Sequence, residues 1–183
     1  MAYTLEKGRP SDTSTRLAKE VRCYDFLDSL GIEYERIDHP AFDTMADCSE
    51  TDELFGVGTV KNLLLCNSQK TEFYMLLMPA DKKFKTKELS KQIGSARLSF
   101  ASGEHMESLL DITPGSLTIL GLMNDPDKRV RLLVDRDLEE STHLVVHPCI
   151  NTTSLKIKTS DVFGTYLGSL GREPVFVFLT GED

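Results

Sequence analysis

Several features of other protein classes are absent from this sequence of 183 residues. No apolar run approaches the roughly 18 residues that a membrane-spanning helix needs. Residues 1–10 are polar and lack the apolar core of a secretory signal, so we expect a cytoplasmic protein. The four cysteines are widely spaced without a CxxC pair, which argues against a disulfide framework and against a zinc ribbon.

Positive charge is scarce, since 29 acidic residues outnumber 21 basic ones and give a net charge of −8. A protein that coats nucleic acid needs a large positive field, which this chain lacks globally. The local exception is residues 81–91, which hold five lysines and two acidic residues. This stretch is either a solvated helix start or a contact to a short length of phosphate backbone.

Motifs of several enzyme classes are missing as well. The sequence contains no GxSxG elbow, no GxxxxGK[ST] phosphate loop and no HExxH zinc helix. Its composition, 40% hydrophobic and 27% charged, is that of an ordinary globular domain. We therefore expect residues 1–183 to form a single domain, with a loose N-terminal segment at residues 1–12.

Hydrophobic periodicity predicts strands in consecutive groups, with helices placed irregularly between them. Helices are predicted at 17–27, 43–54, 86–93, 104–110 and 161–170. Strands are predicted at 32–37, 60–66, 73–78, 97–101, 117–122, 130–134, 143–146 and 175–179. This order does not follow strict βαβ units, so it favours an α+β fold over a doubly wound parallel sheet.

Lys61 is the residue whose setting is chemically most unusual. It stands at the head of the strand at 60–66, which is apolar on both faces and therefore expected to be central in a sheet. It shares a face with Leu63 and Leu65. A poorly solvated ammonium needs an anionic or carbonyl partner, so Lys61 can bind a phosphate or polarise an ester carbonyl. Alternatively, Lys61 lies at an exposed strand end and snorkels into water.

His147 is the second candidate for a functional side chain. The strand pattern places His143, Val145, His147 and Cys149 on one face. Three interpretations are open: a metal site of two imidazoles and a thiolate, a pocket wall beside a substrate, or a histidine packed at a strand end. The glycine turn at 113–118 is flanked by hydroxyls, and its backbone groups can orient a water or hold a ribose.

Five sequence segments occur together in a characteristic order. They are His39-Pro40 followed by Thr44, then 60–65, 98–101 and 114–118, and finally His147-Pro148 followed by Asn151-Thr152. This set resembles the bacterial prolyl-tRNA synthetase editing domain and its freestanding relatives, the YbaK-type deacylases, over roughly residues 21–179. The resemblance implies an α+β fold with a mixed, partly barrel-like sheet surrounded by helices. It also implies hydrolysis of mischarged tRNA(Pro) without a metal or a cofactor.

The resemblance further implies roles for individual residues. Lys61 and Gly115 are expected to be catalytic, and Thr44, Asn62, Ser116 and His147 are expected to bind the substrate. The proline of the family's GxxxP loop is replaced here by Ile119. This departure keeps open a second hypothesis, a non-catalytic module of the same fold that senses an aminoacyl-tRNA or an amino acid.

The expected substrate and partners also follow from the resemblance. The freestanding alanyl-tRNA(Pro) deacylases are the most similar group, so alanine is the first choice among small amino acids that include cysteine and serine. The partner is the acceptor end of mischarged tRNA(Pro). Prolyl-tRNA synthetase or an elongation factor is a further candidate partner that gives access to it.

Overall fold

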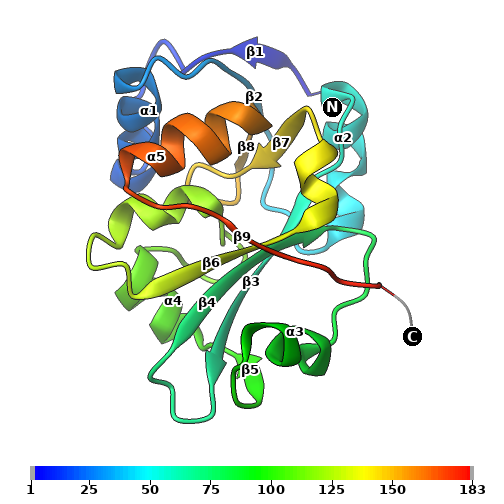
Figure 1. The fold of residues 1–183 in the computed structure, drawn as a ribbon. Helices are drawn as coiled ribbons and strands as arrows, with labels where there is room; N and C mark the ends of the chain where they lie inside the picture. The colour runs from blue at the N-terminus through cyan, green and yellow to red at the C-terminus, as the bar shows by residue number, and fades with distance from the viewer. Residues whose placement is uncertain (1–2, 182–183) are drawn as a thin grey trace.

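The computed structural model describes residues 3–181, and its larger sheet is built around a hairpin of two apolar strands. β3 (Val60–Asn67) and β4 (Phe73–Pro79) pair antiparallel. β4 is buried along nearly its whole length, because core side chains cover both faces of the sheet. The sheet order is β5-β3-β4-β6-β9 (Figure 1), with β5 (Leu98–Phe100) antiparallel to β3, and with parallel pairing of β6 (Val130–Asp135) to β4 and of β9 (Val175–Val177) to β6.

The smaller sheet is antiparallel throughout. Its strands, in the order β1-β2-β8-β7, are β1 (Leu5–Lys7), β2 (Tyr34–Asp38), β8 (Thr153–Lys158) and β7 (His143–Val146). A bridge between Thr59 and Val145 joins β7 to the residue before β3. The sheets share one core without closing into a barrel. The predicted α+β fold with a mixed, partly barrel-like sheet surrounded by helices is therefore confirmed.

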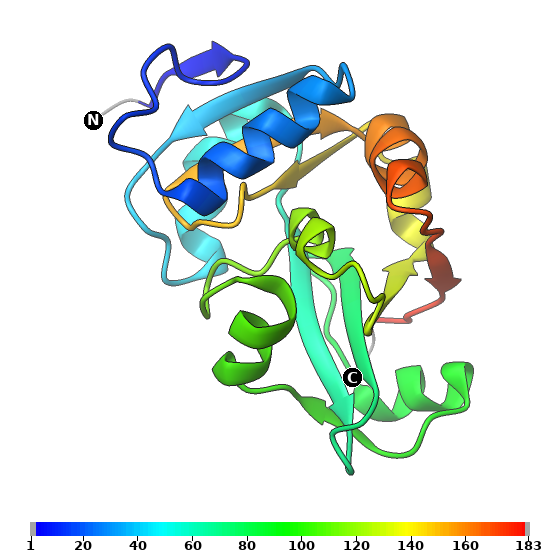
Figure 2. The same cartoon turned by 90° about the vertical axis from the view of Figure 1, so that its left-hand side faces the viewer.

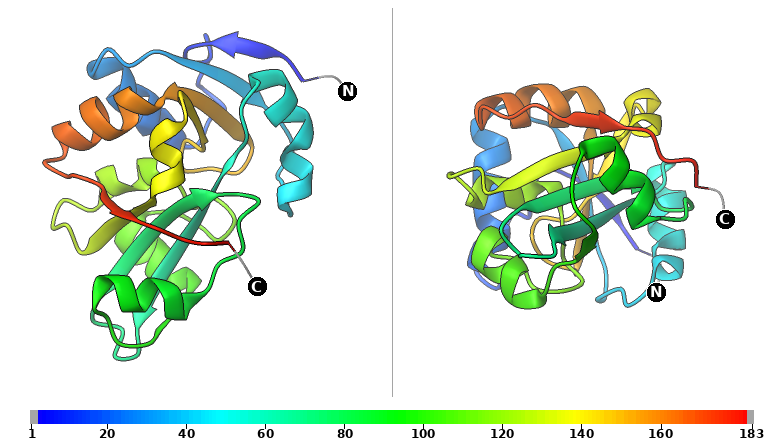
Figure 3. Two further views of the ribbon diagram at one scale, coloured as in Figure 1. Left: turned by 45° about the vertical axis from the view of Figure 1, so that its right-hand side comes forward. Right: turned by 60° about the horizontal axis from the view of Figure 1, so that its bottom comes forward.

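Helices cover the sheets on several sides (Figures 2 and 3). The main core receives side chains from α1 (Ala18–Ser29), α4 (Gly103–Leu110), η2 (Ile119–Asn124), η3 (Arg136–Glu140) and the run of η4 (Asp161–Tyr166) and α5 (Leu167–Ser169). The opposite face of the larger sheet packs on α3 (Thr86–Ile93). The remaining helices are η1 (Met45–Cys48) and α2 (Ser49–Phe55), whose Phe55 packs on the smaller sheet. Within residues 3–181, no helix is long and apolar enough to cross a membrane.

The segment predicted as a strand at 117–122 is instead mostly the 3-10 helix η2, so that prediction is wrong. Thr118 caps this helix, because its hydroxyl accepts a hydrogen bond from the backbone N–H of Leu120 at 3.3 Å. The Tyr166 hydroxyl donates to the carbonyl oxygen of Leu120 at 2.7 Å and holds the helix against the core. A short apolar run that is buried on all sides looks the same in sequence whether it is strand or helix.

Two expectations about the smaller sheet also differ from the structure. Residues 5–7 pair with β2 as strand β1, so this part of the segment expected to be loose is ordered, while residues 1–2 lie outside the described residues. Strand β8 is not among the predicted strands. Its buried Leu155 and Ile157 alternate with lysines, which is the period-two pattern of a half-exposed strand, so the sequence did carry a signal for it.

Candidate active site

The predicted site residues converge on one cavity of about 310 Å³ at the start of β3. Five of the six predicted residues line it, namely Thr44, Lys61, Asn62, Gly115 and His147. They come from the loop before η1, from β3, from the turn before η2 and from the loop after β7 (Figure 1). The sixth predicted residue, Ser116, is buried and does not line the cavity.

Strand β3 has an open edge at this cavity. β5 pairs only with residues 65–67 of β3, and one further bond runs from the backbone N–H of Ala101 to the carbonyl oxygen of Leu64 at 2.9 Å. The backbone groups of alternate residues point to the same edge of a strand. The N–H and C=O of Asn62 therefore face this edge beyond the end of β5, where a ligand can pair with them.

The side chains of β3 alternate between the two faces of the sheet around this edge. Leu63 packs with the core beneath α3, so Lys61 lies on that face. Leu64 belongs to the main core, so Asn62 lies on the opposite face. All four side chains line the cavity, which therefore wraps around the open edge and reaches both faces.

Lys61 is held by a backbone carbonyl rather than by an acid. Its Nζ donates to the carbonyl oxygen of Lys82 at 2.9 Å. Lys82 is itself fixed, because its ammonium lies 2.8 Å from the carboxylates of Asp135 and Asp137. Within the described part of the chain, no carboxylate lies within ion-pair distance of Lys61. The half-buried Lys61 thus offers an uncompensated charge and two further donors to a ligand, which favours the functional over the snorkelling interpretation.

Asn62 carries an unsatisfied polar atom at the cavity. Its Nδ2 donates to the carbonyl oxygen of Val60 at 3.3 Å. Its Oδ1 is buried and has no hydrogen-bond partner among residues 3–181. A buried carbonyl oxygen without a partner costs about 1–3 kcal/mol. A ligand that donates a hydrogen bond to Oδ1 recovers this free energy on binding.

His147 presents one defined ring nitrogen to the cavity. Its Nδ1 lies 2.9 Å from the carbonyl oxygen of Thr153. A carbonyl oxygen only accepts, so Nδ1 carries the proton and Nε2 is left as an acceptor. Burial lowers the pKa of His147 below its ordinary value of 6.5, and this outweighs the bond to Thr153. The imidazole is therefore neutral at neutral pH.

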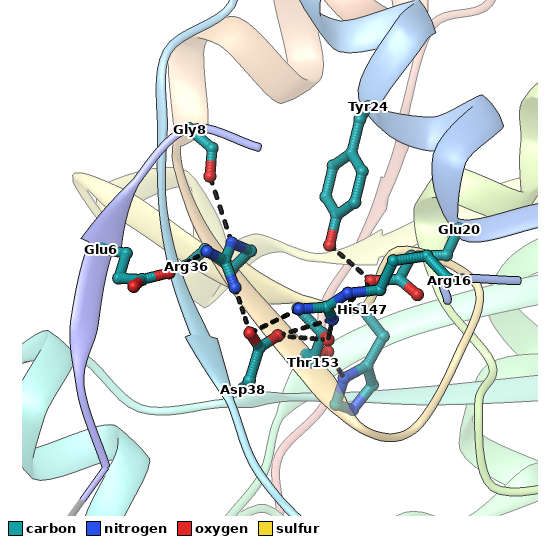
Figure 4. Close-up of polar contacts among 9 residues, drawn as sticks. All are labelled: Glu6, Gly8, Arg16, Glu20, Tyr24, Arg36, Asp38, His147 and Thr153. Atoms are coloured by element: carbon teal, nitrogen blue, oxygen red, sulfur yellow. Dashed lines mark hydrogen bonds and ion pairs between the residues drawn. The ribbon is translucent and has the colours of Figure 1, made fainter. Parts of the chain in front are cut away.

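An ion-pair network is connected to His147 through Thr153 (Figure 4). The hydroxyl of Thr153 donates to Asp38 at 2.8 Å, and Arg16 donates to the same carboxylate at 2.7 and 2.9 Å. Arg36 also donates to Asp38. Burial alone would raise the pKa of Asp38, but the hydrogen bonds from the two arginines and Thr153 hold that pKa well below its usual range. The network fixes the strand segment to which His147 is bound.

Asn151 connects two loops of the cavity wall through hydrogen bonds to the backbone of Phe42. Its Nδ2 donates to the carbonyl oxygen of Phe42 at 2.7 Å, and its Oδ1 accepts from the N–H of Phe42 at 3.3 Å. Gly115 has φ +89°, and a Cβ there would lie 3.4 Å from Asn151 Nδ2. The nearby Thr44 caps η1, and its hydroxyl is 3.0 Å from Asp47. Thr44 therefore shapes the cavity wall while its hydroxyl is engaged in the cap.

Several residues that line the cavity were not predicted as site residues. They are Phe42, Phe100, Met106, Leu117 and Asn151, among others. Asn151 stands within one of the segments that carry the family resemblance, so that segment already contained a signal for it. The apolar residues could not be recognised, because their sequence pattern is that of core positions.

The three side chains considered for a metal site do not converge. His143 Nδ1 lies 3.0 Å from the hydroxyl of Thr142, and His143 does not line the cavity of His147. β7 ends before His147, and Cys149 has φ +61°, so the predicted common strand face does not exist. Cys149 is buried and its Sγ lies 3.4 Å from Sγ of Cys23. The metal-site hypothesis on these residues is therefore wrong, and residues 3–181 contain no other cluster of three metal-ligating side chains.

A larger hollow of about 510 Å³ lies on the smaller sheet and is lined by His143, but by none of the six predicted site residues. Its lysines and acids are present in similar numbers, and Lys156 pairs with Glu35 at 3.1 Å across the strands. The positive and negative side chains of this hollow therefore balance one another. The smaller cavity at β3, with its uncompensated cation and unsatisfied acceptor, is the candidate active site.

Comparisons with known proteins identify the family to which the chain belongs. The chain matches the aminoacyl-tRNA editing domain family over residues 39–164. It is 30% identical over 136 residues to the prolyl-tRNA editing protein ProX of Acetoanaerobium sticklandii, which covers 74% of this chain and 83% of that protein. Prolyl-tRNA synthetase associated domain-containing protein 1 of Danio rerio is 29% identical over 175 residues, which are 94% of this chain and 92% of that protein.

A solved structure shows the same fold. The crystal structure of a candidate trans-editing enzyme for prolyl tRNA synthetase matches with a TM-score of 0.66 at 16% identity, over 89% of this chain and 98% of that one. The family match contains all five predicted residues that line the cavity, from Thr44 to His147. The resemblance inferred from the sequence is therefore confirmed, and the chain belongs to the aminoacyl-tRNA editing domain family.

Proposed function

We propose that this chain is a trans-editing hydrolase that deacylates mischarged tRNA(Pro), with alanyl-tRNA(Pro) as its substrate. The observation that carries the proposal is the uncompensated ammonium of Lys61 at the open edge of β3. An aminoacyl-tRNA end brings a phosphate, an ester carbonyl and a ribose, all of which suit this cation. The relative ProX is named a prolyl-tRNA editing protein, which supports the same reaction.

The two faces of β3 suggest where the nucleotide and the amino-acid side chain of the substrate bind. Lys61 lies on the outer face, where its ammonium would hold the terminal nucleotide and face the ester carbonyl. Asn62 lies on the inner face, where Met106 and Leu117 supply an apolar wall for a small side chain. The Oδ1 of Asn62 and the Nε2 of His147 are two acceptors for the α-ammonium or a ribose hydroxyl. The ester then lies at the open edge of β3, between Lys61 on one face and Asn62 on the other.

Hydrolysis needs no side-chain nucleophile in this arrangement. A water oriented by the backbone at Gly115 attacks the ester carbonyl carbon, and the bond from that carbon to the ribose oxygen breaks. The ribose oxygen takes up a proton as the water loses one, and a free amino acid and intact tRNA are released. An aminoacyl ester is already activated, so positioning and the charge of Lys61 supply the catalysis. Neither a metal nor a cofactor has a part in this scheme.

Selection by size explains why such a site is useful. A pocket made for proline discriminates against a smaller side chain by only about 1–3 kcal/mol for each missing methylene. A second site that admits only small side chains reverses this selection. The cavity of about 310 Å³ also has to hold the ribose, and Thr44 and His147 narrow it, so we propose that they exclude proline.

Ile119 replaces the loop proline but does not disturb the glycine turn. Gly115 keeps its positive φ of +89°, and η2, which begins at Ile119, is held by Tyr166. The glycine turn is therefore formed without the proline. This geometry favours the hydrolase over the non-catalytic sensing module that the substitution had left open.

The test is a substrate panel with wild-type protein in the presence of a metal chelator. We expect rapid hydrolysis of alanyl-tRNA(Pro), slower hydrolysis of cysteinyl-tRNA(Pro) and survival of prolyl-tRNA(Pro). Hydrolysis of the cysteinyl ester alone would support the proposed deacylase reaction but would make cysteine, rather than alanine, the amino acid that is removed. Survival of every ester, together with measurable binding of alanyl-tRNA(Pro), would establish the sensing module instead.

A further inference from the structure

Phe100 places an exposed aromatic ring at the rim of the candidate active site. Its side chain is 63% exposed, more than any other large apolar residue in the described part of the chain. It also lines the cavity that holds Lys61. Single exposed apolar residues are common on protein surfaces, so exposure alone is weak evidence. Its position at the cavity that holds Lys61 is what makes this ring notable.

The ring of Phe100 is fixed by its strand and by a second ring. Phe100 lies opposite Leu65 in the pairing of β5 with β3, which places it on the face of the sheet that also carries Lys61. The ring of Phe84 meets it edge to face, with 6.3 Å between centroids and 67° between planes. Phe84 packs on the core beneath α3. The pair is therefore a preorganised apolar surface next to the cation.

Positive charge lies beside these rings. Lys85, Lys87 and Lys91 are exposed on and just before α3, which lies next to β5 (Figures 1 and 3). Lys82 does not belong to this group, because it is bound internally to Asp135. An aromatic surface flanked by lysines is the combination that binds single-stranded nucleic acid, with bases stacked on rings and cations at phosphates. This group of exposed lysines is unusual in a chain with a net charge of −8.

We propose that Phe100 is a stacking platform for a base in the single-stranded 3′ end of the tRNA, with Lys85 and Lys87 at the neighbouring phosphates. The proposal rests on the proposed function for the identity of the RNA. The esterified ribose lies at Lys61, and the chain of nucleotides leading to it passes over the Phe100 ring toward α3. The platform would add affinity for the unpaired end without reading its sequence.

The test compares two RNA hairpins that differ only in a single-stranded 3′ overhang of four nucleotides ending in CCA. Binding is measured by fluorescence anisotropy for wild type, Phe100→Ala, Phe100→Trp and Phe178→Ala. Phe178 is a matched control, because it is 55% exposed and does not line the cavity. We expect Phe100→Ala to weaken binding of the overhang hairpin about 5- to 150-fold. Phe100→Trp and Phe178→Ala should bind as wild type does, and the blunt hairpin should not respond to Phe100→Ala.

The lysines are tested by salt dependence. Replacing Lys85 and Lys87 by alanine should reduce the slope of log affinity against log salt by roughly 0.7 for each phosphate that the variant no longer neutralises. An unchanged slope contradicts the assignment of these lysines to phosphates. Equal binding of the overhang hairpin by Phe100→Ala and wild type overturns the platform, and would leave the rings as a surface for another protein.

Deacylation measured in parallel separates this proposal from the proposed function. If wild type cleaves alanyl-tRNA(Pro) and Phe100→Ala cleaves it with the same kcat/KM, the platform is wrong and the hydrolase stands. If wild type binds the overhang through Phe100 but cleaves no ester, the platform stands and the hydrolase is wrong.

Discussion

His147 and Thr153 are joined by a hydrogen bond that decides which nitrogen of the imidazole faces the cavity. The bond from Nδ1 to the carbonyl oxygen is 2.9 Å long and leaves Nε2 as an acceptor. Thr153 is held in turn by Asp38, whose carboxylate is bound by two arginines (Figure 4). The tautomer and orientation of His147 thus depend on charged residues outside the cavity.

The pH profile of the reaction should reflect the low pKa of His147. Burial lowers this pKa below 6.5, so the neutral acceptor form persists as the pH falls through 6.5 and is lost only at lower pH. Protonation turns Nε2 from an acceptor into a donor and adds a positive charge to the site. We therefore expect kcat/KM for alanyl-tRNA(Pro) to retain more than half of its pH 7 value at pH 6.5 and to fall at lower pH.

The control for this profile is His147→Gln, which keeps an acceptor oxygen and does not titrate. Its activity should be lower but should lack the fall on the acid side. A wild-type profile that has already dropped by half at pH 6.5 would contradict the assignment.

Asp38→Asn should destabilise the fold in a pH-dependent way. Arg36 is 3% exposed while the Asp38 side chain is 39% exposed, so we expect a loss between that of a surface pair and that of a buried pair, about 2 kcal/mol. Because the folded-state pKa of Asp38 lies below 3.8, its contribution is complete above pH 3.8 and is lost as the pH falls toward the folded-state value.

Urea unfolding of wild type and Asp38→Asn at several pH values checks this prediction. The difference between their free energies of unfolding should be constant from pH 5 to 7 and should shrink below pH 3.8. A difference that grows as the pH falls would mean that the network does not stabilise the ionised carboxylate.

Gly115→Ala should impair both folding stability and activity. The residue has φ +89°, and an added Cβ would lie 3.4 Å from the Asn151 side chain. A left-handed conformation costs a non-glycine residue about 1–2 kcal/mol, and relief of this strain would move the backbone that orients the water. Gly164→Ala is the matched control, because that glycine lies in η4 with no atom within 4 Å of an added Cβ. Thermal unfolding and deacylation should both respond to the first substitution only.

Asn62→Leu should stabilise the protein and reduce its activity. The Oδ1 of Asn62 is buried without a partner, so an apolar residue of similar size removes an unfavourable group and should raise the free energy of unfolding by about 1 kcal/mol. The same change removes an acceptor for the substrate and should lower kcat/KM at least about 10-fold. A variant that is less stable than wild type would show that the amide has a structural role.

The sequence pattern singled out Lys61 as a candidate and left an exposed, snorkelling lysine as the alternative. The apolar run after Lys61 marked a central strand, and a lysine at its head indicated an unusual environment. Pleat alternation also follows from sequence, but the unpaired edge of β3 does not, because it depends on where β5 ends. For that reason the placement of Lys61 and Asn62 on opposite sides of one open edge emerged only from the structure.

Other features were beyond sequence patterns for identifiable reasons. The exposure of Phe100 could not be predicted, since an aromatic residue in a short strand is more often buried. His143 and His147 do not share a strand face because β7 ends at Val146, and the backbone beyond it is irregular, with a positive φ at the non-glycine residue Cys149. Strand periodicity does not anticipate where a strand ends. The pairing of Lys82 with Asp135 joins residues far apart in the chain and removes that lysine from the exposed group.

We propose that the charge of Lys61 is required for ester hydrolysis, and single-turnover deacylation of alanyl-tRNA(Pro) measures its contribution. Wild type, Lys61→Ala and the surface control Lys158→Ala are compared with chelator present. We expect Lys61→Ala to slow the reaction about 100-fold or more while Lys158→Ala, an exposed lysine outside the candidate active site, remains like wild type. Equal rates for Lys61→Ala and wild type would show that the charge of Lys61 is not needed for hydrolysis.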